Sequence, residues 1–130
     1  MLKEQAGTAV EAPHQADGEY LEHPYYQTAR DVYQTIHTSH LDRFTFLWVE
    51  SLWEDLSAAL YELESLPETV SKDLLEVIEL LTDARNELRL ARFLFDVEEI
   101  NPVYRLVMRN RAVLRCEHIL HKVIFRLKLP

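Results

Sequence analysis

The most regular apolar pattern in the chain lies in residues 71–97, which read SKDLLEVIELLTDARNELRLARFLFDV. Apolar residues recur there three and four positions apart, a spacing that places their side chains on one face of an α-helix. Pro67 and the acidic Glu68 supply a helix-start signal just before this segment. We therefore expect a long amphipathic helix over about residues 68–97. Its apolar face consists of Leu74, Leu75, Ile78, Leu81, Ala84, Leu88, Ala91, Leu94 and Phe95.

The same spacing predicts two helices on the N-terminal side, over about residues 25–37 and 40–64. Ser39, followed by Asp42 three positions later, resembles a capping box and predicts that the second of these helices starts there. The preceding residues, 1–24, contain two glycines, two prolines and five acids against one lysine. Because this segment has no helical apolar period, we expect it to be a disordered acidic tail.

A fourth helix is predicted over about residues 102–127, because Asn101 and Pro102 form a favourable N-cap and first-turn pair. Short connections between successive long helices favour antiparallel neighbours. The fold class that follows is all-α, an up-down antiparallel four-helix bundle over residues 25–130. The expected apolar face of the fourth helix consists of Val103, Leu106, Val107, Val113, Leu120, Val123, Ile124 and Leu127.

Composition supports one helical domain and excludes several functional classes. The chain has 130 residues, 48% of them hydrophobic and 28% charged, which is enough for a single core. Its two glycines argue against a turn-rich β fold and against a phosphate-binding P-loop or Rossmann turn. The single cysteine, Cys116, excludes an internal disulfide and fits a reducing compartment. Without a signal pattern or an apolar run of membrane-spanning length, we expect a cytoplasmic protein with no membrane partner.

Charge is distributed unevenly along the chain. Residues 101–130 carry seven Arg and Lys against one acid, a local charge of +6, whereas the first hundred residues carry seven bases against 21 acids. The net charge is −8. A cationic last helix on an anionic body indicates either a surface for a polyanion or a segment that pairs with acidic neighbours.

Two basic lines provide the candidate nucleic-acid contacts, since adjacent cationic lines can track a phosphate backbone. On the last helix, steps of three and four positions place the bases along one face about 22 Å long. This line consists of Arg111, Arg115, His118, Lys122 and Arg126. The third helix carries Arg85, Arg89 and Arg92, and the cationic segment also includes Arg105 and Arg109. The alternative is a solvated face, or a face whose bases form salt bridges to acids of the second helix. These acids are Glu50, Glu54, Asp55, Glu62 and Glu64.

Histidines suggest two further kinds of chemistry. They form two pairs at a spacing of three, which are His37 with His40 and His118 with His121. None of the four predicted helices carries the Glu-x-x-His ligand pair of di-iron bundles, so neither a metal nor another cofactor is expected. Arg111 with His118, or Arg115 with His121, fits the signature of HEPN-type ribonucleases, an Arg and a His separated by four to six residues. In those enzymes the Arg would stabilise phosphate charge and the His would act as general base. A ribonuclease of this type is therefore one functional alternative.

The second helix is rich in aromatic residues. Phe44 and Trp48 belong to its apolar stripe, whereas Phe46 and Trp53 lie off that stripe. Because aromatic side chains concentrate at subunit contacts, we expect Phe46 and Trp53 to contribute to a partner interface.

Short motifs in three helices resemble one bacterial protein family. The segment His40–Leu47, HLDRFTFL, is similar to the Glu-Arg-Phe-Thr-Leu entry of that family's second helix. The segment Ala84–Arg92, ARNELRLAR, together with Ile100–Tyr104 and Ile119–Lys122, is similar to the motifs across its third and fourth helices. The family consists of four-helix-bundle proteins first met in ribosomal-RNA intervening sequences, and it includes the accessory variability determinant of diversity-generating retroelements. The resemblance spans about residues 25–125.

This resemblance implies a homo-oligomer, a pentameric barrel of bundles without catalytic residues, whose positive surface binds a reverse transcriptase and its template RNA. It matches Arg85, Arg89 and Arg92 to the family's helix-three arginines, and it gives Arg43 and Tyr104 structural roles. We therefore expect a non-enzymatic accessory protein that binds RNA and a polymerase or reverse-transcriptase partner through its third and fourth helices. The first alternative is an acidic protein–protein adaptor or scaffold without nucleic-acid binding, which the net charge of −8 favours.

Overall fold

The computed structural model describes residues 24–39, 44–65 and 72–128. These residues form four α-helices and no strand, which confirms the all-α class for the part of the chain described. The helices are α2 (Pro24–His37), α3 (Phe46–Glu64), α4 (Lys72–Phe93) and α5 (Pro102–Lys128). Apart from Pro24, the predicted acidic tail lies outside the described residues, as does the helix-start signal at Pro67 and Glu68.

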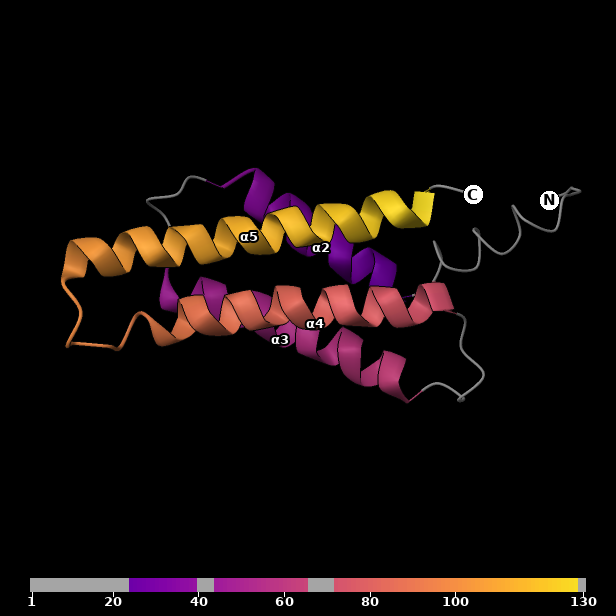
Figure 1. Ribbon diagram of the computed structural model, residues 1–130, viewed down its shortest axis with the longest axis horizontal. Coiled ribbons are helices and arrows are strands. Elements are labelled where there is room, and N and C mark those ends of the chain that lie inside the picture. Colours follow the sequence, from indigo (N-terminus) through magenta and orange to yellow (C-terminus); the bar gives the residue numbers. More distant parts are fainter. Residues whose placement is uncertain (1–23, 40–43, 66–71, 129–130) are drawn as a thin grey trace, which may run out of the picture.

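The four helices lie side by side along the long axis of the molecule (Figure 1). α5 packs against α4 and α2, and α3 packs against the same two helices, so α3 and α5 lie diagonally opposite each other. Residues 94–101 join α4 to α5 at one end of the molecule (Figure 1). This packing is compatible with a helical bundle. None of the described helices combines the length and the apolar character needed to cross a membrane.

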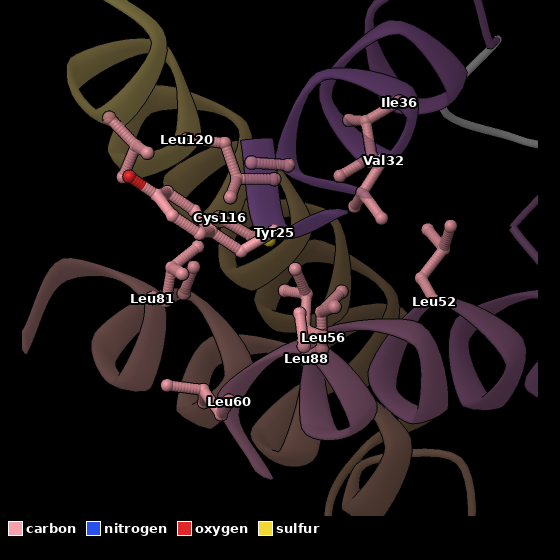
Figure 2. Close-up of a cluster of buried hydrophobic side chains, with 14 of the residues drawn as sticks. Tyr25, Val32, Ile36, Leu52, Leu56, Leu60, Leu81, Leu88, Cys116 and Leu120 are labelled. Atoms are coloured by element: carbon pink, nitrogen blue, oxygen red, sulfur yellow. The ribbon is translucent and has the colours of Figure 1, made fainter. Parts of the chain in front are cut away.

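The core lies between the helices and draws side chains from all four (Figure 2). Tyr25 of α2, Leu56 of α3, Leu88 of α4 and Leu120 of α5 are each at most 1% exposed. Fully burying a leucine side chain stabilises the folded state by about 1.5–3 kcal/mol. Apolar residues that recur three and four positions apart in the sequence are therefore residues of the core. One expected member, Leu75, lies 51% exposed instead.

α3 begins later than the sequence predicts. The Oγ1 atom of Thr45 accepts a hydrogen bond from the backbone N–H of Trp48 at 3.1 Å, so Thr45 is the N-cap and Phe46 the first helical residue. The prediction of a start at the Ser39 capping box is wrong. The Ser39 hydroxyl donates to the carbonyl oxygen of Thr35, and it therefore satisfies an acceptor at the end of α2.

α5 begins where the sequence predicts and is much longer than its neighbour α2. The Oδ1 atom of Asn101 accepts a hydrogen bond from the backbone N–H of Val103 at 2.8 Å, which confirms Asn101 as an N-cap. α2 has 14 residues and α5 has 27. The last residue of α2, His37, meets Glu117, which lies fifteen residues after α5 begins. About 22 Å of α5 therefore precedes the level at which α2 ends.

The first turns of α5 do not form the apolar core face that the sequence predicts. Val103, Leu106 and Val107 are 70%, 41% and 47% exposed. We call these three residues the α5 apolar patch. The buried face of α5 consists instead of Ala112, Val113, Cys116, Leu120, Val123 and Ile124. The difference arises because the patch lies beyond His37, where the described part of α2 no longer covers α5.

Candidate nucleic-acid interface

The outer face of α5 presents a line of bases to solvent. Arg111, Arg115, His118 and Lys122 are all exposed, and we call these four residues the α5 basic line. The side chain of Arg126, the last predicted member, lies outside the described residues. Within the part of the chain that the structure describes, neither Arg111 nor Lys122 forms an ion pair or a side-chain hydrogen bond. Two cationic groups on this face are therefore available to a phosphate.

Arg115 has a carboxylate partner, although not one of those expected. Its Nε atom lies 3.0 Å from Oε1 of Glu87 on α4, and the Arg115 side chain remains 49% exposed. An exposed ion pair of this kind contributes about 0–1 kcal/mol, so a phosphate can compete for Arg115. The alternative of salt bridges to acids of the second helix finds no support among the described residues. No ion pair there involves Glu50, Glu54, Asp55, Glu62 or Glu64.

The arginines of α4 lie on the side of that helix that faces α3. The guanidinium carbon of Arg92 lies 4.5 Å from the ring centroid of Trp53 in α3. Arg85 is half-buried and Arg89 is exposed. Glu87, which meets α5, lies five residues before Arg92 and so about 140° away around the helix. The α4 arginines therefore lie on a different side of α4 from Glu87, which contacts the α5 basic line. The α5 basic line stands alone as the candidate interface.

Arg105 and Arg109 pack against the connection between α4 and α5. Nη1 of Arg105 donates to the carbonyl oxygen of Phe95 at 3.4 Å, and the guanidinium carbon of Arg109 lies 4.1 Å from the Phe95 ring centroid. Burial, followed by the nearby charge of Arg105, lowers the pKa of Arg109 from its ordinary value. The Nε atoms of both arginines are buried and have no hydrogen-bond partner in the described structure. Both residues thus hold the connection in place, and they contribute less to a phosphate-binding face than their sequence positions predict.

The two aromatic residues predicted at a partner interface pack within the chain. Phe46 is half-buried and its ring meets Phe95 edge-on, with centroids 5.8 Å apart. Trp53 is half-buried beneath Arg92. Their interface role stays a prediction. More exposed apolar side chains among the described residues include Leu47, Tyr61, Phe93 and the α5 apolar patch. Sequence periodicity assigned the patch to the core and gave no signal of its exposure.

Two of the described histidines, His37 of α2 and His121 of α5, each contact the other helix. Nδ1 of His37 lies 2.8 Å from Oε2 of Glu117, and the His121 ring lies 5.8 Å from that of Tyr33. His40, the other member of the first pair, lies outside the described residues. Among the described residues, no group of three or more His, Cys, Asp and Glu side chains is arranged to hold a metal ion.

The ribonuclease alternative requires one Arg and one His that act on the same phosphate. Arg115 meets Glu87 on the α4 side of α5, whereas His121 meets Tyr33 on the α2 side. Six residues of separation also place Arg115 and His121 about 120° apart around the helix. Arg111 and His118 share the outer face but lie about 10 Å apart along it. The geometry therefore does not favour an Arg–His catalytic pair.

Comparisons of the chain with protein-family models, with curated proteins and with solved structures found no match. The resemblance of its short motifs to the intervening-sequence family accordingly stays a prediction. Support for a function comes from the residues of this chain and from their arrangement.

Proposed function

We propose that this protein is a non-enzymatic, oligomeric accessory protein that binds RNA through the α5 basic line. The observation that carries the proposal is the pair Arg111 and Lys122, two exposed cations on one helical face that lack acidic partners in the described part of the chain. We further propose that the helices form an up-down antiparallel four-helix bundle and that residues 1–24 form a disordered acidic tail.

The dimensions and charge of this face suit a phosphate backbone. Arg111 and Lys122 are eleven residues apart, which corresponds to about 17 Å along the helix axis. Successive phosphates of a helical strand are about 3.4 Å apart along its axis, so the line reaches several of them. Contacts of this kind position the nucleic acid but do not read its sequence. The local +6 of residues 101–130 favours RNA near α5, whereas the net charge of −8 opposes it at long range.

Self-association and a polymerase partner complete the proposal. The motif resemblance supports a pentamer and a partner of the reverse-transcriptase type. One feature of the structure supports contact between copies, which is the exposure of the α5 apolar patch. A contact that joins two different faces of identical subunits generates a ring when its rotation closes.

Charge reversal tests the RNA-binding face. The double variant Arg111→Glu/Lys122→Glu is expected to weaken binding of a labelled structured RNA on the order of tenfold or more in fluorescence anisotropy at low salt. Arg89→Glu, an exposed reversal on the other side of α4, serves as the control and is expected to have a small effect. Equal weakening by Arg89→Glu would show that net charge, rather than the α5 basic line, governs binding.

The second candidate function is a protein–protein adaptor. It is favoured by the exposed acids Glu54, Asp55 and Glu62 of α3, which have no ion pair in the described part of the chain. These acids would meet a basic partner, and the α5 basic line would be used at subunit contacts. Absence of RNA binding even at low salt, where charge attraction is strongest, would select this function.

A further inference from the structure

A pocket lies between α2 and α5, on the C-terminal side of the His37–Glu117 contact. Its volume is about 330 Å³, which is at the small end of the range for sites that hold organic ligands. It is an open hollow between two helices that lie side by side (Figure 1). The residues that line it are Arg30, Tyr33, Gln34, His121, Ile124 and Phe125.

Aromatic rings form a continuous series along this pocket. Tyr33 stacks on His37 with centroids 5.4 Å apart and ring planes 13° apart. The His121 ring lies 5.8 Å from that of Tyr33 at an interplanar angle of 41°, and it stacks on Phe125 at 6.3 Å and 13°. Phe125 is 55% exposed. Planar π surfaces from both helices are thus accessible from solvent, and the tilt between Tyr33 and His121 leaves their faces incompletely paired with each other.

Polar groups on α2 complete the lining. Arg30 and Gln34 are one helical turn apart, and both side chains are exposed. Neither side chain takes part in a hydrogen bond or ion pair within the described residues. A guanidinium offers donors suited to a phosphate, and a carboxamide offers a donor and an acceptor side by side. On α5, Lys122 of the α5 basic line directly follows His121.

We propose that this pocket binds one unstacked nucleobase of a single-stranded RNA, and this inference rests on the proposed function. Tyr33 and His121 supply the stacking surface, Gln34 meets the hydrogen-bonding edge of the base, and Arg30 meets its phosphate. Proteins recognise single-stranded RNA by stacking splayed-out bases on aromatic side chains and by bonding their edges. The α5 basic line contacts only phosphates, so it cannot distinguish RNA from a sugar–phosphate backbone without bases. The pocket would add contacts to a base.

Mononucleotides test the pocket without depending on the α5 basic line. Each of the four nucleoside 5′-monophosphates is titrated into the full-length protein while the ring protons of Tyr33, His121 and Phe125 are followed by NMR. We expect upfield ring-current shifts at Tyr33 and His121 with at least one nucleotide and none with ribose 5-phosphate, which lacks the base. Equal shifts with ribose 5-phosphate, or no shifts with any nucleotide at millimolar concentration, overturn the inference.

Matched variants separate stacking from general charge attraction. Tyr33→Leu and His121→Ala are each expected to weaken binding of single-stranded RNA by about 5- to 100-fold, whereas Tyr33→Phe and His121→Phe retain it. Thermal unfolding of each variant checks that the fold is kept, and the His121 variants decide the question if Tyr33→Leu fails to fold. All four variants should bind a backbone without bases as wild type does.

If RNA binds through the α5 basic line but Tyr33→Leu and His121→Ala bind it normally, the pocket inference fails and the proposed function stands. If no RNA binds at any salt concentration, the proposed function fails, and the mononucleotide titration still judges the pocket.

Discussion

Nδ1 of His37 and Oε2 of Glu117 lie 2.8 Å apart and join the last turn of α2 to the middle of α5. This contact marks the level at which α5 loses its cover from α2. On the N-terminal side of Glu117 lies the exposed α5 apolar patch, and on the C-terminal side lies the pocket beside His121. One exposed contact therefore separates two surfaces of different chemistry on the same helix.

The His37–Glu117 pair is expected to align α2 on α5 while adding little stability. The His37 side chain is 62% exposed, so water and salt screen the pair. In a double-mutant cycle with His37→Ala and Glu117→Ala, urea unfolding should give a coupling energy of about 0.2–1 kcal/mol that declines in high salt. A coupling well above 2 kcal/mol would mean that the pair is shielded in solution, contrary to the structure.

Arg109 is expected to stabilise the fold more than Arg111 does, although the two are close in sequence. Arg109 packs on the Phe95 ring, whereas Arg111 is exposed and without an ion pair in the described part of the chain. Arg109→Ala should lower the free energy of unfolding by about 1–2 kcal/mol through lost packing and cation–π contact. Arg111→Ala should change it by less than about 0.5 kcal/mol. Equal losses in chemical denaturation would contradict the described packing.

Cys116 is expected to be unreactive in the folded protein. Its side chain is buried, and burial, with smaller contributions from Glu87 and Glu117, raises the pKa of the thiol far above its ordinary value. Iodoacetamide at about pH 8.5 should therefore alkylate Cys116 slowly in buffer and rapidly in denaturant. Rapid alkylation of the folded protein would show that the thiol is accessible.

The same raised pKa predicts how stability depends on pH. A group whose folded pKa lies above its unfolded value contributes stability that is complete below the unfolded pKa and is lost as pH rises toward the folded one. The stability of wild type relative to Cys116→Ala should therefore be constant near neutral pH. It should fall by up to about 1.4 kcal/mol per pH unit above about pH 8.5. Denaturant unfolding of both proteins between pH 7 and 10 measures this difference, and a difference that does not change contradicts the prediction.

The α5 apolar patch is expected to take part in self-association. Val103→Asp/Val107→Asp places two charges on it and should convert an oligomer into smaller species, because burying unpaired carboxylates is costly. Leu75→Asp is the control, because Leu75 is an exposed apolar residue that lies on α4, outside the α5 apolar patch. Light scattering after size exclusion gives the mass of each protein. An unchanged mass for the double variant would remove the patch from any subunit contact.

Local patterns in the sequence predicted the helices well because each depends on near neighbours. The spacing of Leu81 and Leu88 places both in the core, and Asn101 caps α5 through its own first turn. The start of α3 was missed because Ser39 resembles a capping box, whereas the N-cap in the structure is Thr45. Residues 40–43 between them are not described.

The surfaces were harder to predict because they depend on distant parts of the chain. Exposure of Val103 follows from the shortness of α2, which helical periodicity does not reveal. Arg109 and Arg111 look alike in the sequence, yet two residues rotate a side chain by about 200° around the helix. The pocket needs Tyr33 of α2 beside His121 of α5, and only the packing of those helices brings the two rings together.

The most direct test of the central claim is the salt dependence of RNA binding by wild type and by Arg111→Gln/Lys122→Gln. Fluorescence anisotropy from low to physiological salt gives the slope of the logarithm of affinity against the logarithm of salt concentration. If both residues contact phosphates, wild type binds with a steep negative slope, and the variant's slope is shallower by about 1.4–2. Two identical slopes, or no binding by wild type even at low salt, would contradict RNA binding through the α5 basic line.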